Sequence, residues 1–269
     1  MPAANPNPSP ATAVERALNM LEAAAQRRDG LTNSEISRRL NIPKSSASYI
    51  LRALERRGYL RRDAASGRYR LGLKVLSLGR EAQANYDIAG IALPFMRSLV
   101  DRVHLTCHLA VLDQGEAVYI EKLDAPGFFK VDTWVGRRMC VHSTSVGKAL
   151  LSALPPQATE VILRESGLKK RTPKTIVSPS RLLAELDSVR SRGYAVDDEE
   201  NNLGARCMAA PIFDARGGVT AALGVSGTIT QVSRAEMPRI AEALKETARR
   251  ISRMVLREAS PAAPERRPG

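Results

Sequence analysis

Residues 31–63 read LTNSEISRRLNIPKSSASYILRALERRGYLRRD, and residues 67–72 read GRYRLG. Thr32 or Asn33 can cap a short helix, and Glu35 follows Thr32 at the spacing of a capping box. A second helix is expected after a turn of about three residues, because Pro43 favours the first turn of a helix, where its missing N–H costs no hydrogen bond. Two helices joined by so short a turn predict a helix-turn-helix unit.

The helix predicted for residues 43–57 separates its side chains into two faces. An apolar stripe at helical spacing consists of Ala47, Ile50, Leu51 and Leu54. The opposite face carries hydroxyl groups towards its N-terminus and guanidinium groups towards its C-terminus. Such a face fits the major groove of DNA, where short polar side chains contact bases or phosphates and an arginine can bind guanine in a bidentate way.

After Gly58, the segments YLRRD and RYRLG flank residues 64–67, which predicts a β-hairpin with basic residues on both arms. An amphipathic helix from Thr12 to the turn at Asp29 and Gly30 precedes these elements. This order is the plan of a winged helix-turn-helix domain, whose hairpin arginines would contact phosphates or the minor groove. The predicted DNA-contacting residues are Lys44, Ser45, Ser46, Ser48, Tyr49, Arg52 and Arg56 on the helix, and Arg61, Arg62, Arg68 and Arg70 on the hairpin.

The distribution of charge agrees with this assignment. The chain has 269 residues, of which 43% are hydrophobic and 26% charged, and a formal net charge of +13. Residues 1–80 contain 15 Lys and Arg against 6 Asp and Glu, whereas residues 81–269 contain 26 against 22. The basic excess is therefore N-terminal, as expected of a nucleic-acid-binding domain attached to a nearly neutral one. The composition is that of a globular protein, and no apolar run reaches the length of a membrane span.

The remainder of the chain predicts a mixture of helices and strands. The segments LTCHLAVLD and EAVYIEKL flank Gln114-Gly115, which is a hairpin pattern. Further strands are expected near residues 128–134, 206–213 and 219–228, and helices near residues 72–85, 145–153, 180–192 and 233–257. This order favours an α+β fold, with an antiparallel sheet flanked by helices.

Two separate blocks resemble the IclR family of bacterial transcriptional regulators. The first is the segment quoted above; the second comprises VHSTSVGKALL at residues 141–151 and GYAVDDEENNLGARCMAAPIFD at residues 193–214. The resemblance covers about residues 11–256 and implies a GAF-like α/β effector-binding domain joined by a linker helix to the winged helix-turn-helix domain. The predicted organisation is a disordered tail at 1–10, the DNA-binding domain at 11–72, the linker helix at 73–86, the effector-binding domain at 87–258 and a second disordered tail at 259–269.

The segment HSTSVGK offers hydroxyl groups and free backbone N–H groups at the start of a helix, which suits an anion, although the same residues can simply cap the helix. The resemblance implies that the effector lies against this helix start, and it adds further motif positions. The effector-binding set is Ser143, Ser145, Val146, Gly147, Asp197, Cys207, Gly224 and Ser226. Some relatives have a second serine where this chain has Gly224, so one hydrogen-bond partner for the effector is absent here. Ser145 and Val146 are bulkier than the small pair of some relatives, so a narrower pocket is expected at these positions.

The resemblance also implies the partners. It predicts a regulator that is not an enzyme, uses no cofactor or metal, and binds a palindromic DNA operator as a homodimer that can pair into a dimer of dimers. The effector would be a small organic, sugar or aromatic acid, and no membrane is involved. Cys107, Cys140 and Cys207 form no disulfide framework and the N-terminus does not resemble a secretory signal, so a cytoplasmic location is expected.

Other interpretations of the same residues stay open. Cys207 could be a nucleophile with His142 as base and Asp197 as the orienting group, or a redox-sensing thiol. A zinc site could use His104, Cys107, His108 and Cys140, although a strand over residues 105–113 would point the second and third of these to opposite faces. An architectural DNA-binding protein without an effector would explain the basic first domain but give the second domain no role.

Overall fold

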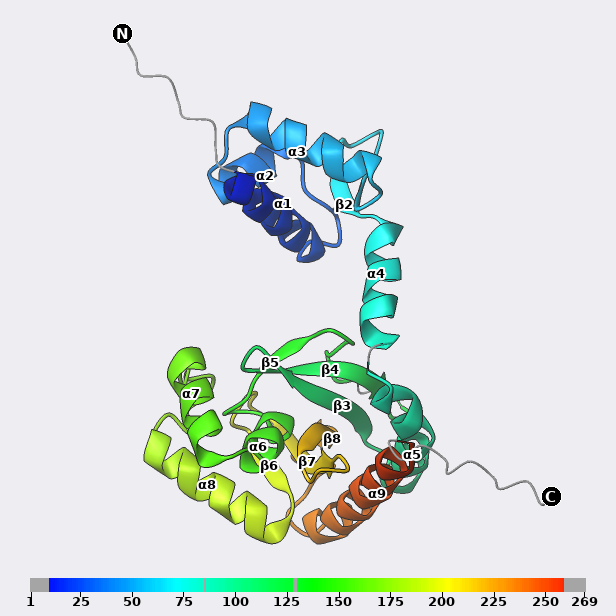
Figure 1. Cartoon of the computed structure of the whole chain (residues 1–269), viewed down its shortest axis with the longest axis vertical. Helices are drawn as coiled ribbons and strands as arrows, with labels where there is room; N and C mark the ends of the chain where they lie inside the picture. Colours follow the sequence, from blue (N-terminus) through cyan, green and yellow to red (C-terminus); the bar gives the residue numbers. More distant parts are fainter. Residues whose placement is uncertain (1–9, 85, 128–129, 259–269) are drawn as a thin grey trace, which may run out of the picture. The chain divides into compact units, whose positions relative to one another are not determined.

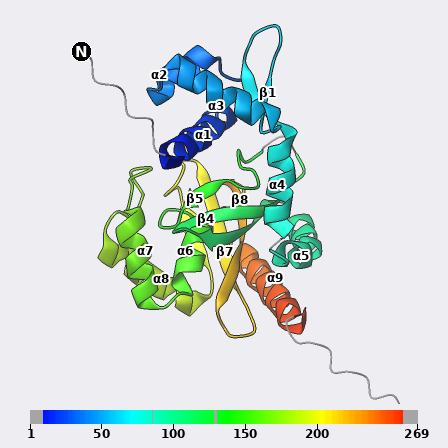
Figure 2. The same ribbon diagram turned by 45° about the horizontal axis from the view of Figure 1, so that its top comes forward.

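The computed structural model describes residues 10–84, 86–127 and 130–258, and the chain divides into two units, Met1–Asn85 and Tyr86–Gly269. The predicted tails lie outside the described residues, except that Pro10 already begins the first helix. Among the described residues, no helix combines the length and hydrophobicity needed to span a bilayer. Figures 1 and 2 show the elements of each unit.

The first unit has the order predicted for a winged helix-turn-helix domain, followed by one more helix. Its elements are α1 (Pro10–Ala25), α2 (Asn33–Leu40), α3 (Lys44–Arg56), β1 (Leu60–Arg62), β2 (Tyr69–Leu71) and α4 (Leu73–Ala84). The capping box is present, because Thr32 Oγ1 accepts a hydrogen bond from the Glu35 N–H while the Glu35 carboxylate accepts one from the Thr32 N–H. Asn41 ends α2 in the left-handed conformation, at φ 52°, and so allows the sharp turn into α3.

A small apolar core fixes α3 against the rest of this unit. Ala47 and Leu51 of α3 are fully buried, and they pack with Met20 of α1, Ile36 of α2 and Leu60 of β1. The predicted apolar stripe of α3 is therefore its core face. Because that face is buried, the opposite side of α3 is the one presented to solvent.

The described part of the second unit contains a six-stranded sheet in the order β5-β4-β3-β8-β7-β6, in which all neighbouring strands are antiparallel. Its strands are β3 (Thr106–Asp113), β4 (Glu116–Leu123), β5 (Arg138–Cys140), β6 (Ala195–Asp198), β7 (Ala205–Phe213) and β8 (Val219–Thr228). Its helices are α5 (Ile88–Val103), α6 (Ser145–Ser152), α7 (Pro156–Ser166), α8 (Pro179–Arg192) and α9 (Met237–Glu258).

Helices cover both faces of this sheet, as Figures 1 and 2 show. On one face, α5 and α9 pack over a core that includes Cys107, Met208 and Leu223. On the other face, α6 and α8 pack over a second core that includes Tyr119 and Ala222. The α+β class predicted from the sequence is confirmed, and the second core supports the N-terminal end of α6.

Some local predictions were wrong. Residues 130–134 form no strand, and residues 128 and 129 lie outside the described residues. The strand that pairs with β4 on the side away from β3 is Arg138–Cys140. The sequence analysis also missed β6 and α7. The two missed strands share a cause, because β5 and β6 are only three and four residues long, too short for alternation of apolar and polar residues to be recognised.

Candidate functional site

The solvent face of α3 carries the residues predicted to contact DNA. Lys44, Ser45, Arg52 and Arg56 are exposed, Ser46 and Ser48 are half-buried, and 70% of Tyr49 is exposed. An aromatic side chain so exposed, between hydroxyl and guanidinium groups on a helix of 13 residues, forms no part of the core. The face is free to enter a major groove.

The β1–β2 hairpin, which is the wing of the domain, carries two neighbouring positive charges whose repulsion a bound phosphate would reduce. Arg61 and Arg70 stand directly opposite one another in the β1–β2 register, and both are exposed. Like charges in this position repel each other, so the hairpin carries an unfavourable interaction that an anion placed between them would remove. Arg62 lies over the ring of Tyr69, with its guanidinium carbon 5.9 Å from the ring centroid. This cation–π contact fixes the direction of the Arg62 side chain on the same hairpin.

Arg68 differs from the other wing arginines because its guanidinium group is bound within the domain. Its Nη1 donates to the Glu35 carboxylate at 3.1 Å and to the Gly30 carbonyl at 2.9 Å. The pKa of Glu35 is lowered, first by the hydrogen bond from the Thr32 backbone and then also by Arg68. Arg68 therefore ties the wing to the capping box of α2, which departs from the phosphate contact expected from the sequence.

The second unit contains a cavity of about 70 Å³ at the N-terminal end of α6. Four of the predicted effector residues line it, namely Ser145, Asp197, Cys207 and Ser226. The remaining lining residues are Tyr119, Val131, Thr133, Met139, Thr144, Asn201, Asn202, Ala205 and Gly227. The structure thus brings together residues from β4, β5, α6, β6, β7 and β8, although the motifs that contain them are far apart in the sequence.

The other four predicted effector residues lie around the cavity without lining it. A Cβ on Gly147 would lie 2.3 Å from the Cα of Val141, and one on Gly224 would lie 2.7 Å from Cγ1 of Val146, so both glycines allow α6 to pack closely. Ser143 Oγ donates to Asn201 Oδ1 at 3.4 Å. These residues pack behind the side chains that line the cavity.

Burial controls the charge state of the cavity's ionisable groups. Oδ1 of Asp197 accepts hydrogen bonds from the backbone N–H groups of Glu200 at 2.7 Å and Asn201 at 3.2 Å, yet desolvation raises its pKa to about 7. Desolvation likewise raises the pKa of the Cys207 thiol to about 12, with the Asp197 carboxylate adding to the effect. The cavity therefore offers a neutral thiol and a carboxyl group that titrates near neutral pH.

One wall of the cavity is the loop of residues 130–137, which the sequence analysis had not assigned to the site. His108 Nε2 lies 2.7 Å from Thr133 Oγ1, and Lys122 Nζ donates to the carbonyls of Val131 at 3.1 Å and Thr133 at 2.9 Å. His108 also stacks on Tyr119, at 4.5 Å between ring centroids, and burial lowers its pKa to about 3. A neutral histidine and a lysine thus hold this loop over the cavity.

The geometry weakens two of the other interpretations. His142 is absent from the lining, and its Nε2 lies 3.0 Å from the Lys169 carbonyl, so it is engaged away from the Cys207 thiol. Cys107 packs into the core under α5 and α9, whereas His108 faces Thr133, so the two occupy opposite faces of β3. In the described part of the chain, no three His, Cys, Asp or Glu side chains gather in a way that could hold a metal ion.

Both units of the chain match domains of known proteins. Residues 13–64 match the model of the IclR helix-turn-helix domain, and residues 81–253 match that of the bacterial transcriptional regulator IclR C-terminal domain. The HTH-type transcriptional regulator XynR of Escherichia coli is 33% identical over 240 residues, which are 89% of this chain and 95% of XynR.

Solved structures show the same relationship. The crystal structure of Thermotoga maritima IclR has a TM-score of 0.77 and 31% identity, and the match covers 91% of this chain and 99% of that one. An IclR homologue from Microbacterium hydrocarbonoxydans, solved in complex with 4-hydroxybenzoate, has a TM-score of 0.79 and 28% identity, covering 92% of this chain and 100% of that one.

A DNA-binding winged helix-turn-helix domain joined to a ligand-binding α/β domain defines a transcriptional regulator controlled by a small molecule. The chain belongs to the IclR family of bacterial transcriptional regulators.

Proposed function

We propose that this regulator binds a palindromic operator as a homodimer in the bacterial cytoplasm, and that a small organic acid in the cavity changes its affinity for DNA. The residues 11–72 would bind DNA, residues 73–86 would link the domains, and residues 87–258 would bind the effector. The observation that carries the proposal is the meeting of Ser145, Asp197, Cys207 and Ser226 in one small cavity at the start of α6.

The cavity favours a small ligand with at least one oxygen acceptor. Hydroxyl groups of Ser145 and Ser226 can donate hydrogen bonds, and the N-terminus of α6 attracts negative charge. A volume of about 70 Å³ limits the ligand to few heavy atoms unless the loop of residues 130–137 moves. The 4-hydroxybenzoate bound by the Microbacterium homologue supports an acid as the class of effector.

The exposed apolar side chains of α4 support a homodimer. Leu73 is 82% exposed and Leu76 is 70% exposed, and Val14 and Leu18 of α1 are also exposed in the same unit. Leu73 and Leu76 are three residues apart and so lie on the same side of α4, and an exposed apolar helix face of this kind is typical of an interaction surface. A second copy is the partner that explains them, since a recognition helix reads only a few base pairs and two linked helices fix the half-site spacing.

The proposal is tested by fluorescence anisotropy of the purified protein with the DNA upstream of its own gene and with a scrambled control. Aliphatic, sugar and aromatic acids, including 4-hydroxybenzoate, are then added. We expect preference for the native fragment, a shift in its affinity with at least one acid, and loss of that shift in Asp197→Ala but not in Asp187→Ala, an exposed control carboxylate. Equal binding to both fragments with every acid would instead favour an architectural protein.

A further inference from the structure

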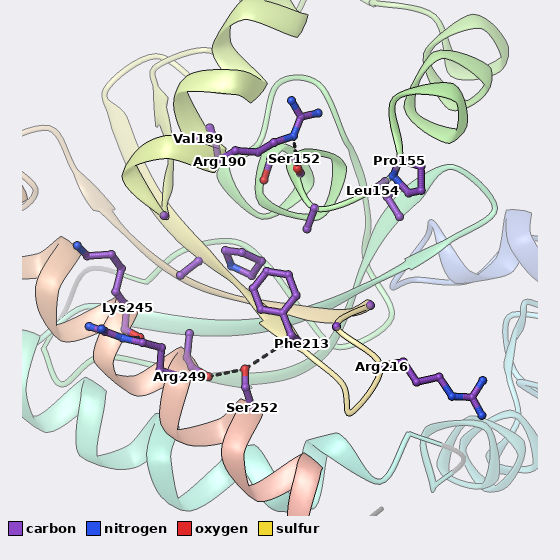
Figure 3. Close-up of a pocket in the computed structure, with 17 residues that line it drawn as sticks. Ser152, Leu154, Pro155, Val189, Arg190, Phe213, Arg216, Lys245, Arg249 and Ser252 are labelled. Atoms are coloured by element: carbon purple, nitrogen blue, oxygen red, sulfur yellow. Dashed lines mark hydrogen bonds between the residues drawn. The ribbon is translucent and has the colours of Figure 1, made fainter.

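A large groove lies on the second unit, away from the effector cavity. It has a volume of about 810 Å³ and shares no lining residue with the cavity of about 70 Å³. It forms where β6 stops short, because β6 pairs with β7 only up to Ala209, whereas β7 continues to Phe213. The C-terminal end of α6, α8, the β7–β8 turn and α9 enclose the space left beside that strand (Figure 3).

The floor of the groove is apolar. The ring of Phe213 lies at the centre of the labelled side chains in Figure 3, with Leu154, Pro155 and Val189 around it. Phe213 is 38% exposed, a large fraction for an aromatic ring at the bottom of a concave surface. Apolar walls with a volume of this order are typical of small-molecule sites, which usually measure about 300–1,000 Å³.

The free edge of β7 is not suited to pairing with another strand. Pro211 has no N–H group to donate, and the Phe213 N–H is already bonded to Ser252 Oγ of α9 at 3.0 Å. An extended peptide that binds by β-augmentation would need these donors. The groove therefore favours a compact ligand that contacts the side chains of the floor.

The rim is cationic. Among the lining residues, Arg190, Arg216, Lys245 and Arg249 carry positive charge and none carries a carboxylate. Lys245 and Arg249 share a single carboxylate, that of Glu242, at 3.1 Å each. Within the described residues, Arg216 has no ion pair, while Arg190 pairs with Asp187 on α8. The Asp214 carboxylate also lies at this rim, where it accepts hydrogen bonds from the Arg216 and Gly218 N–H groups. Four cations against the carboxylates of Asp187, Asp214 and Glu242 leave a net positive charge around the apolar floor.

We propose that this groove is a second ligand site, which binds an amphipathic organic anion with its aromatic or aliphatic body on Phe213 and its acidic group at the cationic rim. This site would give the regulator an input that is separate from the small acid bound near Asp197. It does not depend on the operator or on the effector cavity, so it can be tested without DNA.

The probe is 8-anilinonaphthalene-1-sulfonate, an aromatic anion whose fluorescence rises in an apolar site, titrated into the folded full-length protein. Its uncharged relative N-phenyl-1-naphthylamine separates the roles of charge and apolar contact. We expect saturable binding of both dyes to the wild type. Phe213→Ser should weaken the binding of both dyes at least tenfold. Arg216→Glu and Lys245→Glu should weaken only the binding of the anionic dye, by about three- to tenfold, because each replaces a cation near the anion with a carboxylate.

Two control variants localise the signal. Arg164→Glu reverses an exposed charge on α7 outside the groove, and Val161→Ser removes an exposed apolar side chain from the same helix; neither should change dye binding. Circular dichroism and urea unfolding establish that each variant is folded. Equal effects of Arg216→Glu and Arg164→Glu would overturn the charge argument. Unchanged binding in folded Phe213→Ser, or loss of binding in Val161→Ser, would overturn the site itself.

Discussion

Val146 on α6 and Gly224 on β8 are complementary, because a Cβ on Gly224 would lie 2.7 Å from Cγ1 of Val146. The branched valine side chain occupies the space that a larger residue on β8 would need, and it cannot swing away easily because β-branched side chains are restricted at χ1. The glycine at position 224 and the bulky valine at position 146, which the sequence analysis treated separately, are thus one packing solution. Position 224 does not reach the cavity in this chain.

The first prediction concerns this pair. Gly224→Ala should destabilise the wild type by about 1–3 kcal/mol through overpacking, and should cost far less in a Val146→Ala background, where the space is free. The measurement is urea unfolding in both backgrounds. Gly90→Ala is the matched control, since nothing lies within 4 Å of its added Cβ, and it should be neutral or stabilising. An equal cost in both backgrounds would show that the contact does not limit packing.

A second prediction follows from the buried carboxyl group of Asp197. Its pKa is raised from 3.8 to about 7 in the folded protein, so between these values the folded state binds more protons than the unfolded state. Stability therefore falls as pH rises through this window, by a few kcal/mol at most. Asp197→Asn keeps an oxygen acceptor for the Glu200 and Asn201 N–H groups but does not titrate.

Urea unfolding of the wild type and Asp197→Asn at pH 5 and pH 8 tests this sign. The variant should gain stability relative to the wild type as pH increases, because only the wild type must bury a developing charge. Glu200 also has a raised pKa through burial, and its charge raises the pKa of Asp197, so the difference between the two proteins reports the titration of the coupled pair against that of Glu200 alone. A constant difference between pH 5 and pH 8 would mean that Asp197 titrates in its ordinary range.

The third prediction separates the wing arginines. Arg70→Ala should lower the slope of log affinity against log salt concentration by about 0.9, because Arg70 is exposed and free to meet a phosphate. Arg68→Ala should leave that slope unchanged and lower the urea midpoint of unfolding, since its guanidinium group binds Glu35 and Gly30. Anisotropy titrations over a salt series, with unfolding curves for both variants, measure the two effects. If the slopes change equally, Arg68 releases Glu35 on binding DNA.

Arg52 should behave differently from both, which is the fourth prediction. It is exposed on the DNA-facing side of α3, where an arginine can bind guanine O6 and N7. Arg52→Ala should therefore reduce the preference for the native fragment over scrambled DNA, by about 1–3 kcal/mol for a bidentate contact, while non-specific binding changes little. Competition titrations with both fragments measure this preference. A uniform loss of affinity would instead assign Arg52 to the phosphate backbone.

The winged helix-turn-helix domain could be predicted from the sequence because its signals are local. The Thr32–Glu35 capping box and the apolar stripe of α3 each lie within a few turns of chain, and both are present in the structure. The loop of residues 130–137 could not be predicted. His108 of β3 and Lys122 of β4 hold this loop, and no local sequence pattern indicates such contacts.

The candidate effector site could likewise be predicted only in part from the sequence. Motif positions led to Asp197, Cys207 and Ser226, all of which line the cavity. Tyr119 was missed, although alternation along β4 places it on the same buried face as Ala117, and that signal could have found it. The motifs could not show whether a residue lines the cavity or supports the wall behind it.

The fifth prediction bears on whether Cys207 takes part in chemistry. Burial raises its thiol pKa to about 12, so at pH 8 far less of it is thiolate in the folded protein than in the unfolded chain. Iodoacetamide should therefore label Cys207 far more slowly in the folded protein than in urea, as measured by mass spectrometry of its peptide. The unfolded chain is the internal control, because it contains the same residue without burial. Rapid labelling in the folded state would restore the nucleophile interpretation, whereas slow labelling leaves Cys207 as a neutral wall of the cavity, which fits a domain that binds its ligand without converting it.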